Sequence, residues 1–398
     1  EYMGSALSFT TPIFMSLSSL HEHGELHYSY LQPSQEHDHQ PLKCNYSCLA
    51  TVAVTRAYVS SLALVGKFLF IGTSDGEIRY LKRASWPTGE TGGNILVAKA
   101  NGAVKCLLFS CERLFSGHQD DKIRAWKIST QELDDEPKCT HHATFPTLGD
   151  RVLRALSSKN QVRVRRHKTR TWVHHNDAVS GLAFSSDRSL LYSVSWDRTL
   201  KIWRASDCKC LESVENAHTD AINAVAASGE GNVFTGSADG KVKVWRKRSG
   251  RKELSLVGVL EKHRCGVNAL ALNSDGSVLF SGSSDRSVVA WERRSRVDER
   301  YYLPVNILEG HREAVLCLCA VGGALFSGSA DKTVRVWKGS GKVYSCVAVL
   351  AGHHGPVKCL TVMSTADNGS GSGVLYSGSL DGTVKIWQFR FPCIHGTQ

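Results

Sequence analysis

An all-β fold made of repeated four-stranded units is predicted by three features of this sequence: a recurring phrase, its even spacing, and a match between the two ends of the repeated region. Each copy of the phrase reads as strand, tight turn, strand, with aromatic and β-branched residues before a small-residue stretch and an Asp-containing turn. An alternating apolar and basic strand follows, and it ends in Trp in every copy but the first. The copies are Leu69–Tyr80, Leu114–Trp126, Leu191–Trp203, Val233–Trp245, Leu279–Trp291, Leu325–Trp337 and Leu375–Trp387. Seven such units predict a seven-bladed β-propeller.

The turn aspartates give the length of the repeat. They are Asp75, Asp120, Asp197, Asp239, Asp285, Asp331 and Asp381. Their separations are 45, 77, 42, 46, 46 and 50 residues. All but one lie near the roughly 40–45 residues of a four-stranded blade. The exception predicts an insertion, at about residues 140–172, between the second and third repeats.

The two ends of the repeated region predict how the ring closes. The chain ends soon after Trp387, the third strand of the last blade, so that blade lacks its outer strand. Near the other end, Cys44–Leu64 is similar in sequence to Lys342–Leu360. We therefore expect Ser47–Val54 to supply the missing strand, which joins the first blade to the last and removes open sheet edges.

A second phrase precedes the copies and is clearest at Glu309–Leu318 (EGHREAVLCL) and Ala351–Leu360 (AGHHGPVKCL). Glycine-histidine before one strand and Trp at the end of another resemble the WD-repeat (WD40) family, which implies a propeller that binds other macromolecules. The Asp that usually follows the Trp in that family is absent. In its place stand Lys127, Arg204, Arg246, Glu292, Lys338 and Gln388.

Four further segments resemble a plant subgroup of this family, the JINGUBANG type, whose propeller is similar to the WD domain of myosin heavy chain kinase B. They are Phe145–Asp150, Val164–Leu182, Ser206–Asn223 and His353–Leu360. This resemblance implies a non-enzymatic regulator in plant cells that acts on pollen germination or growth through a transcription-factor partner. The chain carries no kinase domain.

Composition narrows the class of protein further. Thirteen cysteines, many within apolar runs, fit buried reduced thiols in a cytoplasmic or nuclear protein better than a disulfide framework. The net charge of +11 favours acidic partners, nucleic acid or anionic surfaces. No apolar run reaches the length of about 18 residues that a membrane-spanning helix needs. We expect a flexible polar, His-rich leader at 1–43, a monomeric propeller at 44–390 and a tail at 391–398.

Each full repeat contains the residue types of a Ser-His-Asp triad, for example His311, Ser327 and Asp331, together with Trp337. A catalytic constellation is expected once, whereas this one recurs around the ring. We therefore interpret the four residues as a structural hydrogen-bond network and expect no enzymatic activity. Two Cys-x-Cys pairs, Cys208/Cys210 and Cys317/Cys319, lack the two further ligands of a zinc site, so we expect no metal and no cofactor.

The most specific binding hypothesis concerns the face that carries the turn aspartates, called the top in this family. The residue before each aspartate points outward there, and in one blade it is Trp196, either an interface anchor or packed against a neighbouring loop. Cations expected on the same face are Arg264, Arg312, Lys105 and Lys358. An aromatic among cations would suit an acidic or phosphorylated segment of a partner protein.

Two alternative functions remain open. The segment Arg151–Arg170 carries eight Lys or Arg and no acid, so it is either a solvated loop, a nuclear localisation patch or a nucleic-acid contact. The basic residues nearest its end are Arg163, Arg165, Arg166, Lys168 and Arg170. Trp291–Arg294 (WERR) loosely resembles the box by which some propellers dock on cullin-RING ubiquitin ligases, which would imply a substrate receptor.

Overall fold

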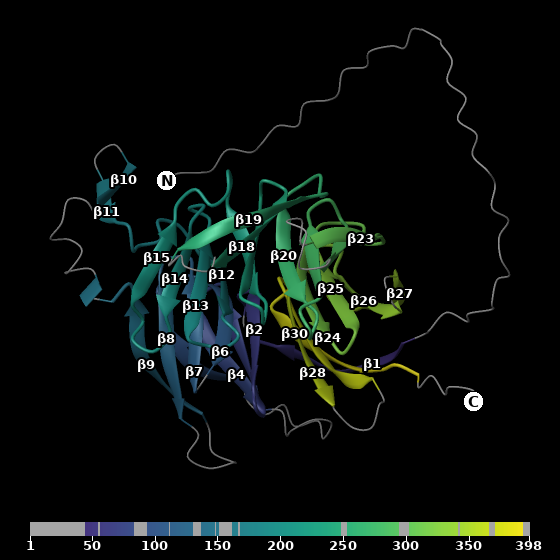
Figure 1. Cartoon of the computed structure of the whole chain (residues 1–398). Coiled ribbons are helices and arrows are strands. Elements are labelled where there is room, and N and C mark those ends of the chain that lie inside the picture. Colours follow the sequence, from purple (N-terminus) through teal and green to yellow (C-terminus); the bar gives the residue numbers. More distant parts are fainter. Residues whose placement is uncertain are drawn as a thin grey trace, which may run out of the picture. The chain divides into compact units, whose positions relative to one another are not determined.

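The computed structural model describes residues 44–54, 56–82, 94–110, 112–129, 137–147, 149–150, 161–165, 168–247, 253–293, 302–340, 343–365 and 371–392. All of them belong to one compact unit, Pro41–Gln398, and the predicted leader at 1–43 lies outside the described residues. Within that part of the chain, thirty strands form seven four-stranded antiparallel sheets and one two-stranded hairpin (Figure 1). The predicted seven-bladed propeller is confirmed.

Four strands that follow one another along the chain make each of the first three blades. Blade 1 has β2 (Val59–Val65), β3 (Phe68–Thr73), β4 (Glu77–Lys82) and β5 (Ile95–Lys99). Blade 2 has β6 (Val104–Ser110), β7 (Arg113–His118), β8 (Ile123–Ser129) and β9 (Lys138–Phe145). Blade 3 has β12 (Val179–Phe184), β13 (Leu190–Ser195), β14 (Leu200–Arg204) and β15 (Cys210–Val214).

The remaining blades repeat this order. Blade 4 has β16 (Ile222–Ala227), β17 (Asn232–Ser237), β18 (Lys241–Lys247) and β19 (Leu254–Glu261). Blade 5 has β20 (Val267–Leu272), β21 (Val278–Ser283), β22 (Val288–Arg293) and β23 (Tyr302–Leu308). Blade 6 has β24 (Val315–Val321), β25 (Ala324–Ser329), β26 (Thr333–Ser340) and β27 (Val343–Ala351). Blade 7 has β28 (Val357–Thr365), β29 (Ser372–Ser379), β30 (Thr383–Arg390) and, from the N-terminal side, β1 (Asn45–Ala53).

The first strands of successive blades contact one another in a closed ring, β2–β6–β12–β16–β20–β24–β28 and back to β2. Because the strands of each blade are antiparallel, the turns between second and third strands lie on the same face as the links between blades. We call this the top face. The turns between first and second strands and between third and fourth strands lie on the opposite, bottom face.

The strand that closes the ring is the predicted one. β1 pairs antiparallel with β30, with Ser47 opposite Gln388 and Val52 opposite Val384, and Figure 1 shows the purple β1 beside the yellow β30. The strand begins and ends close to the expected Ser47–Val54. The Tyr46 hydroxyl also donates to the Val349 carbonyl of blade 6 at 2.9 Å. One short segment therefore joins the last two blades to the N-terminal side of the chain.

Glycine on the second strand sets how closely neighbouring blades approach. A Cβ added to Gly236 or Gly282 would lie 2.7 Å from the side chain of Val267 or Val315 on the first strand of the next blade. Any side chain there would push the blades apart, so the glycine of the recurring phrase is required by packing. The same close approach recurs at Gly72, Gly117, Gly328 and Gly378.

In blade 3 the glycine of this pair lies on the first strand instead of the second. Its second strand has Val194 in place of the glycine, and the residue paired with it on β12 is Gly181. In the other blades the residue paired with the glycine is Ser, Cys or Ala, as in Ala224–Gly236. A Cβ on Gly181 would lie 3.1 Å from Val194 and 3.2 Å from Val225 of blade 4. The pair therefore still contains one glycine, although the glycine has changed strands.

The insertion leaves the ring after blade 2 is complete. The predicted start at about residue 140 lies within β9, so the extra residues connect Phe145 on the top face to β12. They include the hairpin of β10 (Gln161–Arg165) and β11 (Lys168–Thr171). Both ends are held by blade 3: the carboxylate of Asp150, 4% exposed, accepts the Cys210 N–H at 3.2 Å, and the buried Lys201 ammonium donates to the Trp172 carbonyl at 2.5 Å.

No helix in the described part of the chain is long and apolar enough to span a bilayer.

The Gly181–Val194 exchange leads to a stability prediction. We expect Gly181→Ala to cost about 1–3 kcal/mol of unfolding free energy because its Cβ overpacks the space beside Val194 and Val225. The double variant Gly181→Ala/Val194→Gly restores the arrangement of blade 4. Its loss of unfolding free energy, measured by urea unfolding, should be smaller than the sum of the losses of the two single variants by about 1 kcal/mol. Gly229→Ala is the control, because no atom lies within 4 Å of the position that its new Cβ would take. Strict additivity of the two changes would contradict the proposed compensation.

Candidate functional site

A buried hydrogen-bond network recurs at the top of the blades. In blade 6, His311 Nδ1 lies 2.8 Å from the carboxylate of Asp331, and its Nε2 lies 2.7 Å from Ser327 Oγ. The indole N–H of Trp337 donates to the same Oγ at 2.8 Å. The four predicted residues therefore meet, and they connect the start of the blade, its second and third strands and the turn between those strands.

Five blades carry the complete network within the described residues. The other four sets are His175–Ser193–Asp197–Trp203, His218–Thr235–Asp239–Trp245, His263–Ser281–Asp285–Trp291 and His353–Ser377–Asp381–Trp387. Burial lowers the pKa of His175, His218 and His353, so these imidazoles are neutral near pH 7. Burial alone would raise the pKa of Asp331, but hydrogen bonds from His311 and Thr333 outweigh it and hold the pKa well below its usual range.

The network contains the residue types of a hydrolase triad without the access that catalysis needs. Ser327 is fully buried and His311 is 6% exposed. The serine oxygen is also engaged by both the imidazole and the indole. A nucleophile must reach a substrate, whereas a buried and fully bonded network stabilises the turn that it joins. The geometry supports the structural role that we predicted.

Blades 1 and 2 depart from this network. In blade 1, Ile71 and Leu81 occupy the positions of Ser and Trp, and both are buried. In blade 2 the histidine comes from the second strand: His118 Nε2 lies 2.7 Å from Ser116 Oγ, which also accepts the Trp126 indole N–H at 2.8 Å. His118 was not among the residues predicted from the sequence, although it stands in the recurring phrase where the other copies have Ser or Thr.

A cluster of one aromatic and two basic side chains lies on the top face, and we call Trp196, Lys105 and Lys358 the Trp196 cluster. Trp196 is 39% exposed in the turn of blade 3, and the Lys105 ammonium lies 4.8 Å from the centre of its ring. Such a cation–π contact holds the ring in place without covering both of its faces. Burial, followed by the charge of Lys358, lowers the pKa of Lys105, whereas the charge of Asp177 acts in the opposite direction.

The register of the first strands explains why two lysines lie there. In four blades, the second residue of the first strand donates a side-chain hydrogen bond to the first strand of the next blade. For example, Asn223 and Asn268 donate to the carbonyls of Val267 and Val315 at 3.0 and 2.9 Å. Ser60 and Ser180 do the same to Val104 and Ile222. Lys105 and Lys358 occupy the same position in blades 2 and 7. These two blades therefore have a basic side chain where those four have Asn or Ser.

The two predicted arginines lie on the same face but on other blades. Arg264 and Arg312 are exposed and follow the network histidines of blades 5 and 6. Their backbone N–H groups donate to Asp285 and Asp331 at 3.0 Å. The network thus fixes the position of each arginine, but the Trp196 cluster belongs to blades 2, 3 and 7. Of the five predicted partner-binding residues, the structure brings Trp196 and Lys105 into contact, and the charge of Lys358 acts on Lys105.

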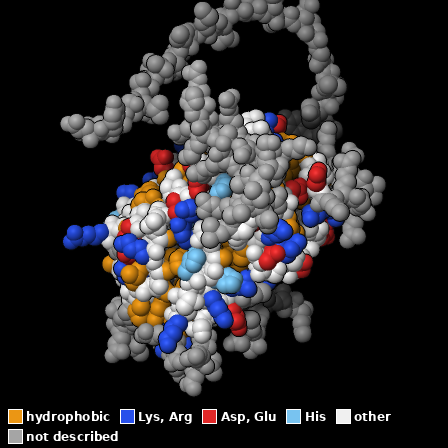
Figure 2. Space-filling view, turned by 90° about the vertical axis from the view of Figure 1, so that its left-hand side faces the viewer, with side chains coloured by type: hydrophobic (Ala, Val, Ile, Leu, Met, Phe, Trp, Pro, Cys, Tyr) orange, Lys and Arg blue, Asp and Glu red, His pale blue; other side chains and the backbone are white. Residues whose placement is uncertain are grey.

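The basic insertion is only partly described. Arg163, Arg165, Lys168 and Arg170 belong to the β10–β11 hairpin, but their side chains, and Arg166 entirely, lie outside the described residues. Figure 2 shows the side of the molecule that faces left in Figure 1. Lys and Arg side chains are scattered there among acidic and hydrophobic ones, so the described surface on that side carries no continuous basic field.

The box Trp291–Arg294 is only partly described, and its described residues Trp291 and Arg293 are bonded within the propeller. Trp291 is 2% exposed and bonded to Ser281 within the network of blade 5, and the Arg293 guanidinium pairs with Glu230 of blade 4. Arg294 lies outside the described residues. The described part of the box therefore contributes to the packing between blades 4 and 5.

The Cys-x-Cys pairs are embedded in the blades. Cys208 and Cys210 are buried beside Trp203, and the Cys317 thiol lies 3.6 Å from the Val357 carbonyl of blade 7. Burial raises the pKa of Cys208 to about 11 and that of Cys317 to about 12, so both thiols stay protonated at neutral pH. Among the described residues, no three His, Cys, Asp or Glu side chains gather in a way that could hold a metal ion.

The family match covers the same five blades that carry the complete hydrogen-bond network. The family model of the WD domain, G-beta repeat, matches residues 166–204, 208–246, 254–292, 303–338 and 344–388. These five segments correspond to blades 3 to 7, the blades with the complete network. The WD40 β-propeller domain of Doa1 superposes with a TM-score of 0.63 at 19% identity, and the match covers 86% of this chain and 96% of that domain.

Curated relatives match over shorter segments. A segment of 102 residues is 32% identical to the small ribosomal subunit protein RACK1 of Drosophila melanogaster and covers 25% of this chain and 30% of that protein. A segment of 139 residues is 25% identical to the 66 kDa stress protein of Physarum polycephalum and covers 32% of this chain and 23% of that protein. The chain thus spans less than a third of the length of these two relatives.

The fold and its buried networks define a seven-bladed β-propeller. The chain is a WD-repeat protein.

The variant network of blade 2 leads to a pH prediction. Burial, followed by the charge of Arg124, lowers the pKa of His118 from its ordinary 6.5 to about 4. Between these values the unfolded chain binds a proton that the folded chain does not. Stability should therefore fall as the pH drops from 6.5 towards 4, by about 2 kcal/mol between pH 7 and pH 5 for this residue. Urea unfolding should show a shallower loss over this interval in His118→Gln, whereas the exposed His354→Gln should behave as wild type. An unchanged pH dependence in His118→Gln would contradict the assignment.

Proposed function

We propose that this protein is a non-enzymatic scaffold whose Trp196 cluster binds an acidic or phosphorylated segment of a partner protein. The observation that carries the proposal is an exposed tryptophan with the ammonium group of Lys105 4.8 Å from the centre of its ring. Tryptophan is the side chain most enriched among the residues that dominate protein–protein binding energy. A ring already held in place loses little conformational freedom when a partner covers it.

Electrostatics favours an anionic occupant for this cluster. The like charge of Lys358 contributes more to the pKa of Lys105 than the opposite charge of Asp177 does, so repulsion between the two ammonium groups is only partly offset in the free protein. A carboxylate or phosphate placed between them would relieve that repulsion and form charge-assisted hydrogen bonds. The net charge of +11 would add a long-range attraction for the same class of partner.

A narrower role rests on sequence resemblance. The insertion and the segments around it are similar to the plant JINGUBANG-type subgroup, which supports a regulator in plant cells that acts on pollen germination or growth through a transcription factor. Such a role would place the protein in the cytoplasm, the nucleus or both. The relative named as a small ribosomal subunit protein belongs to a larger assembly, which supports the more general scaffold function.

The cluster leads to a direct prediction. Trp196→Ala should weaken binding of the principal partner by about 2 kcal/mol, roughly thirtyfold, because it removes the aromatic anchor. Trp196→Ala/Arg312→Ala should recover still less partner if that partner extends across the top face. The measurement is affinity capture from plant tissue at moderate salt with nuclease, followed by titration of the recovered protein.

The control variant is Leu211→Ala on the outer strand of blade 3, because Leu211 is 37% exposed and Trp196 is 39% exposed. Recovery of a discrete partner by wild type and by Leu211→Ala, but not by Trp196→Ala, would support the proposal. An undiminished partner in the double variant would exclude the top face. Recovery of a ligase adaptor that survives the change would favour the substrate-receptor alternative, and steeply salt-dependent recovery of nucleic acid would favour the basic loops.

A further inference from the structure

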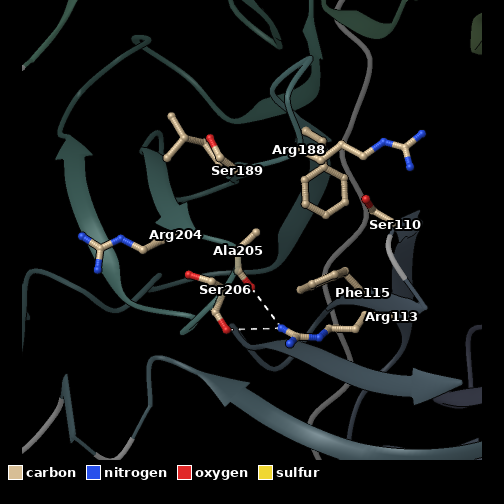
Figure 3. Close-up of a pocket in the computed structure, with 10 residues that line it drawn as sticks. Ser110, Arg113, Phe115, Arg188, Ser189, Arg204, Ala205 and Ser206 are labelled. Carbon is tan, nitrogen blue, oxygen red and sulfur yellow. Dashed lines mark hydrogen bonds between the residues drawn. The ribbon is translucent and has the colours of Figure 1, made fainter.

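A pocket lies on the bottom face, where blades 2 and 3 meet. It encloses about 430 Å³ and is lined by residues from three turns: Ser110 and Arg113 of blade 2, and Arg188–Leu190 and Arg204–Ser206 of blade 3 (Figure 3). Phe115 and Phe184 complete its lining. Neither the Trp196 cluster nor any residue proposed from the sequence contributes to it.

The inner part of the pocket is apolar and already assembled. Phe115 and Phe184 pack edge to face with their ring centres 5.3 Å apart, and Phe115 is only 2% exposed. The Arg113 guanidinium donates to the carbonyls of Ala205 and Ser206 at 3.1 and 3.4 Å, which joins the turn of blade 2 to the turn of blade 3. Figure 3 shows this arginine reaching across the pocket to both carbonyls. The two blades therefore hold the pocket open without a ligand.

The rim carries two further arginines. In Figure 3, Arg188 and Arg204 stand on opposite sides of the pocket and extend away from each other. Arg188 is exposed, and its guanidinium has no partner among the described side chains. Arg204 pairs with Asp207 at 3.0 Å, but both side chains are about half exposed, at 50% and 46%. Such surface pairs contribute little free energy, so a ligand carboxylate or phosphate can replace Asp207.

The nearby acidic groups leave this rim positive. Asp187 lies next to Arg188, but its carboxylate accepts hydrogen bonds from the hydroxyls of Ser185 and Ser189 at 2.5 and 2.7 Å and from the Ser189 N–H at 3.1 Å. Those bonds lower the pKa of Asp187 to about 2 and keep the carboxylate engaged within its own turn. Three arginines thus face one engaged carboxylate and one weakly paired carboxylate.

We propose that this pocket binds a peptide segment in which an apolar side chain stands next to an anionic one, either a carboxylate or a phosphate. The apolar side chain would contact the partly exposed Phe184 and Leu190, while the anion would meet either Arg188 or Arg204 on the rim. A nucleic acid fits less well. Single-stranded bases need an open aromatic face for stacking, and Phe115 is buried. The proposal is independent of the top-face function and gives the scaffold a second binding surface.

Fluorescence anisotropy with labelled short peptides tests this inference on the full chain. The peptides carry a central Phe, Leu or Met flanked by Glu, by phosphoserine or by Lys, in otherwise Gly-Ser sequences. We expect the Glu or phosphoserine peptides to bind and the Lys peptides not to bind, and the two anionic sets distinguish the source of the charge. Arg188→Glu/Arg204→Glu should weaken binding at least about tenfold, because it replaces both rim cations.

The matched control is Arg56→Glu/Arg286→Glu, which makes the same change of charge at two exposed arginines outside the pocket. Like Arg188, Arg286 occupies a turn position with positive φ, 73° against 58°. All titrations are made in the Trp196→Ala background, which removes the anchor of the top-face cluster, so that peptide binding reports the bottom-face pocket. Equal loss in the two charge variants, no preference for anionic peptides, or tighter binding of a poly-dT oligonucleotide than of any peptide would each overturn the proposal.

Discussion

The close approach of one blade to the next is the constraint on which the rest of this propeller depends. A glycine on the second strand lets the first strand of the following blade come within van der Waals contact, and apolar side chains of both blades then fill the space beside it. Phe280 of blade 5, for example, packs in one cluster with Leu325 and Trp337 of blade 6. Since every blade has two neighbours, each contact must fit if the ring is to close. In blade 3 the glycine of the pair lies on the first strand, as Gly181, and the side chain lies on the second strand, as Val194.

Once the blades are at this distance, their polar groups have to be satisfied inside the ring. The His-Ser-Asp-Trp networks do this at the top of the blades, and Asn or Ser side chains bond one first strand to the next. Both devices hold the turns of the top face in fixed positions. The side chains that follow them, such as Arg312 after His311, are consequently presented on a rigid surface.

Departures from the repeat concentrate in one sector of the ring. Blade 1 lacks the polar network, blade 2 takes its histidine from another strand, and blade 3 exchanges glycine with valine. The insertion joins blades 2 and 3, the Trp196 cluster lies on blades 2, 3 and 7, and the Arg113 pocket opens between blades 2 and 3. Blades 4 to 6 keep the regular pattern and supply the scaffold. The ring is therefore asymmetric in the sector where side chains depart from the repeat.

The sequence by itself determined the fold, the number of blades and the closing strand, because each rests on a local pattern that recurs: alternating strands, an Asp-containing turn and a terminal Trp. It also predicted Trp196 as an outward-facing residue, since the position before a turn aspartate is set by local geometry. Only the tertiary structure decided which cations meet that ring. Lys105 lies 91 positions before Trp196, and its ammonium group meets the ring only because the propeller places blades 2 and 3 side by side. The pocket lined by Arg113, Arg188 and Arg204 carries no sequence motif at all, because three turns from two blades create it and none of them is distinctive alone.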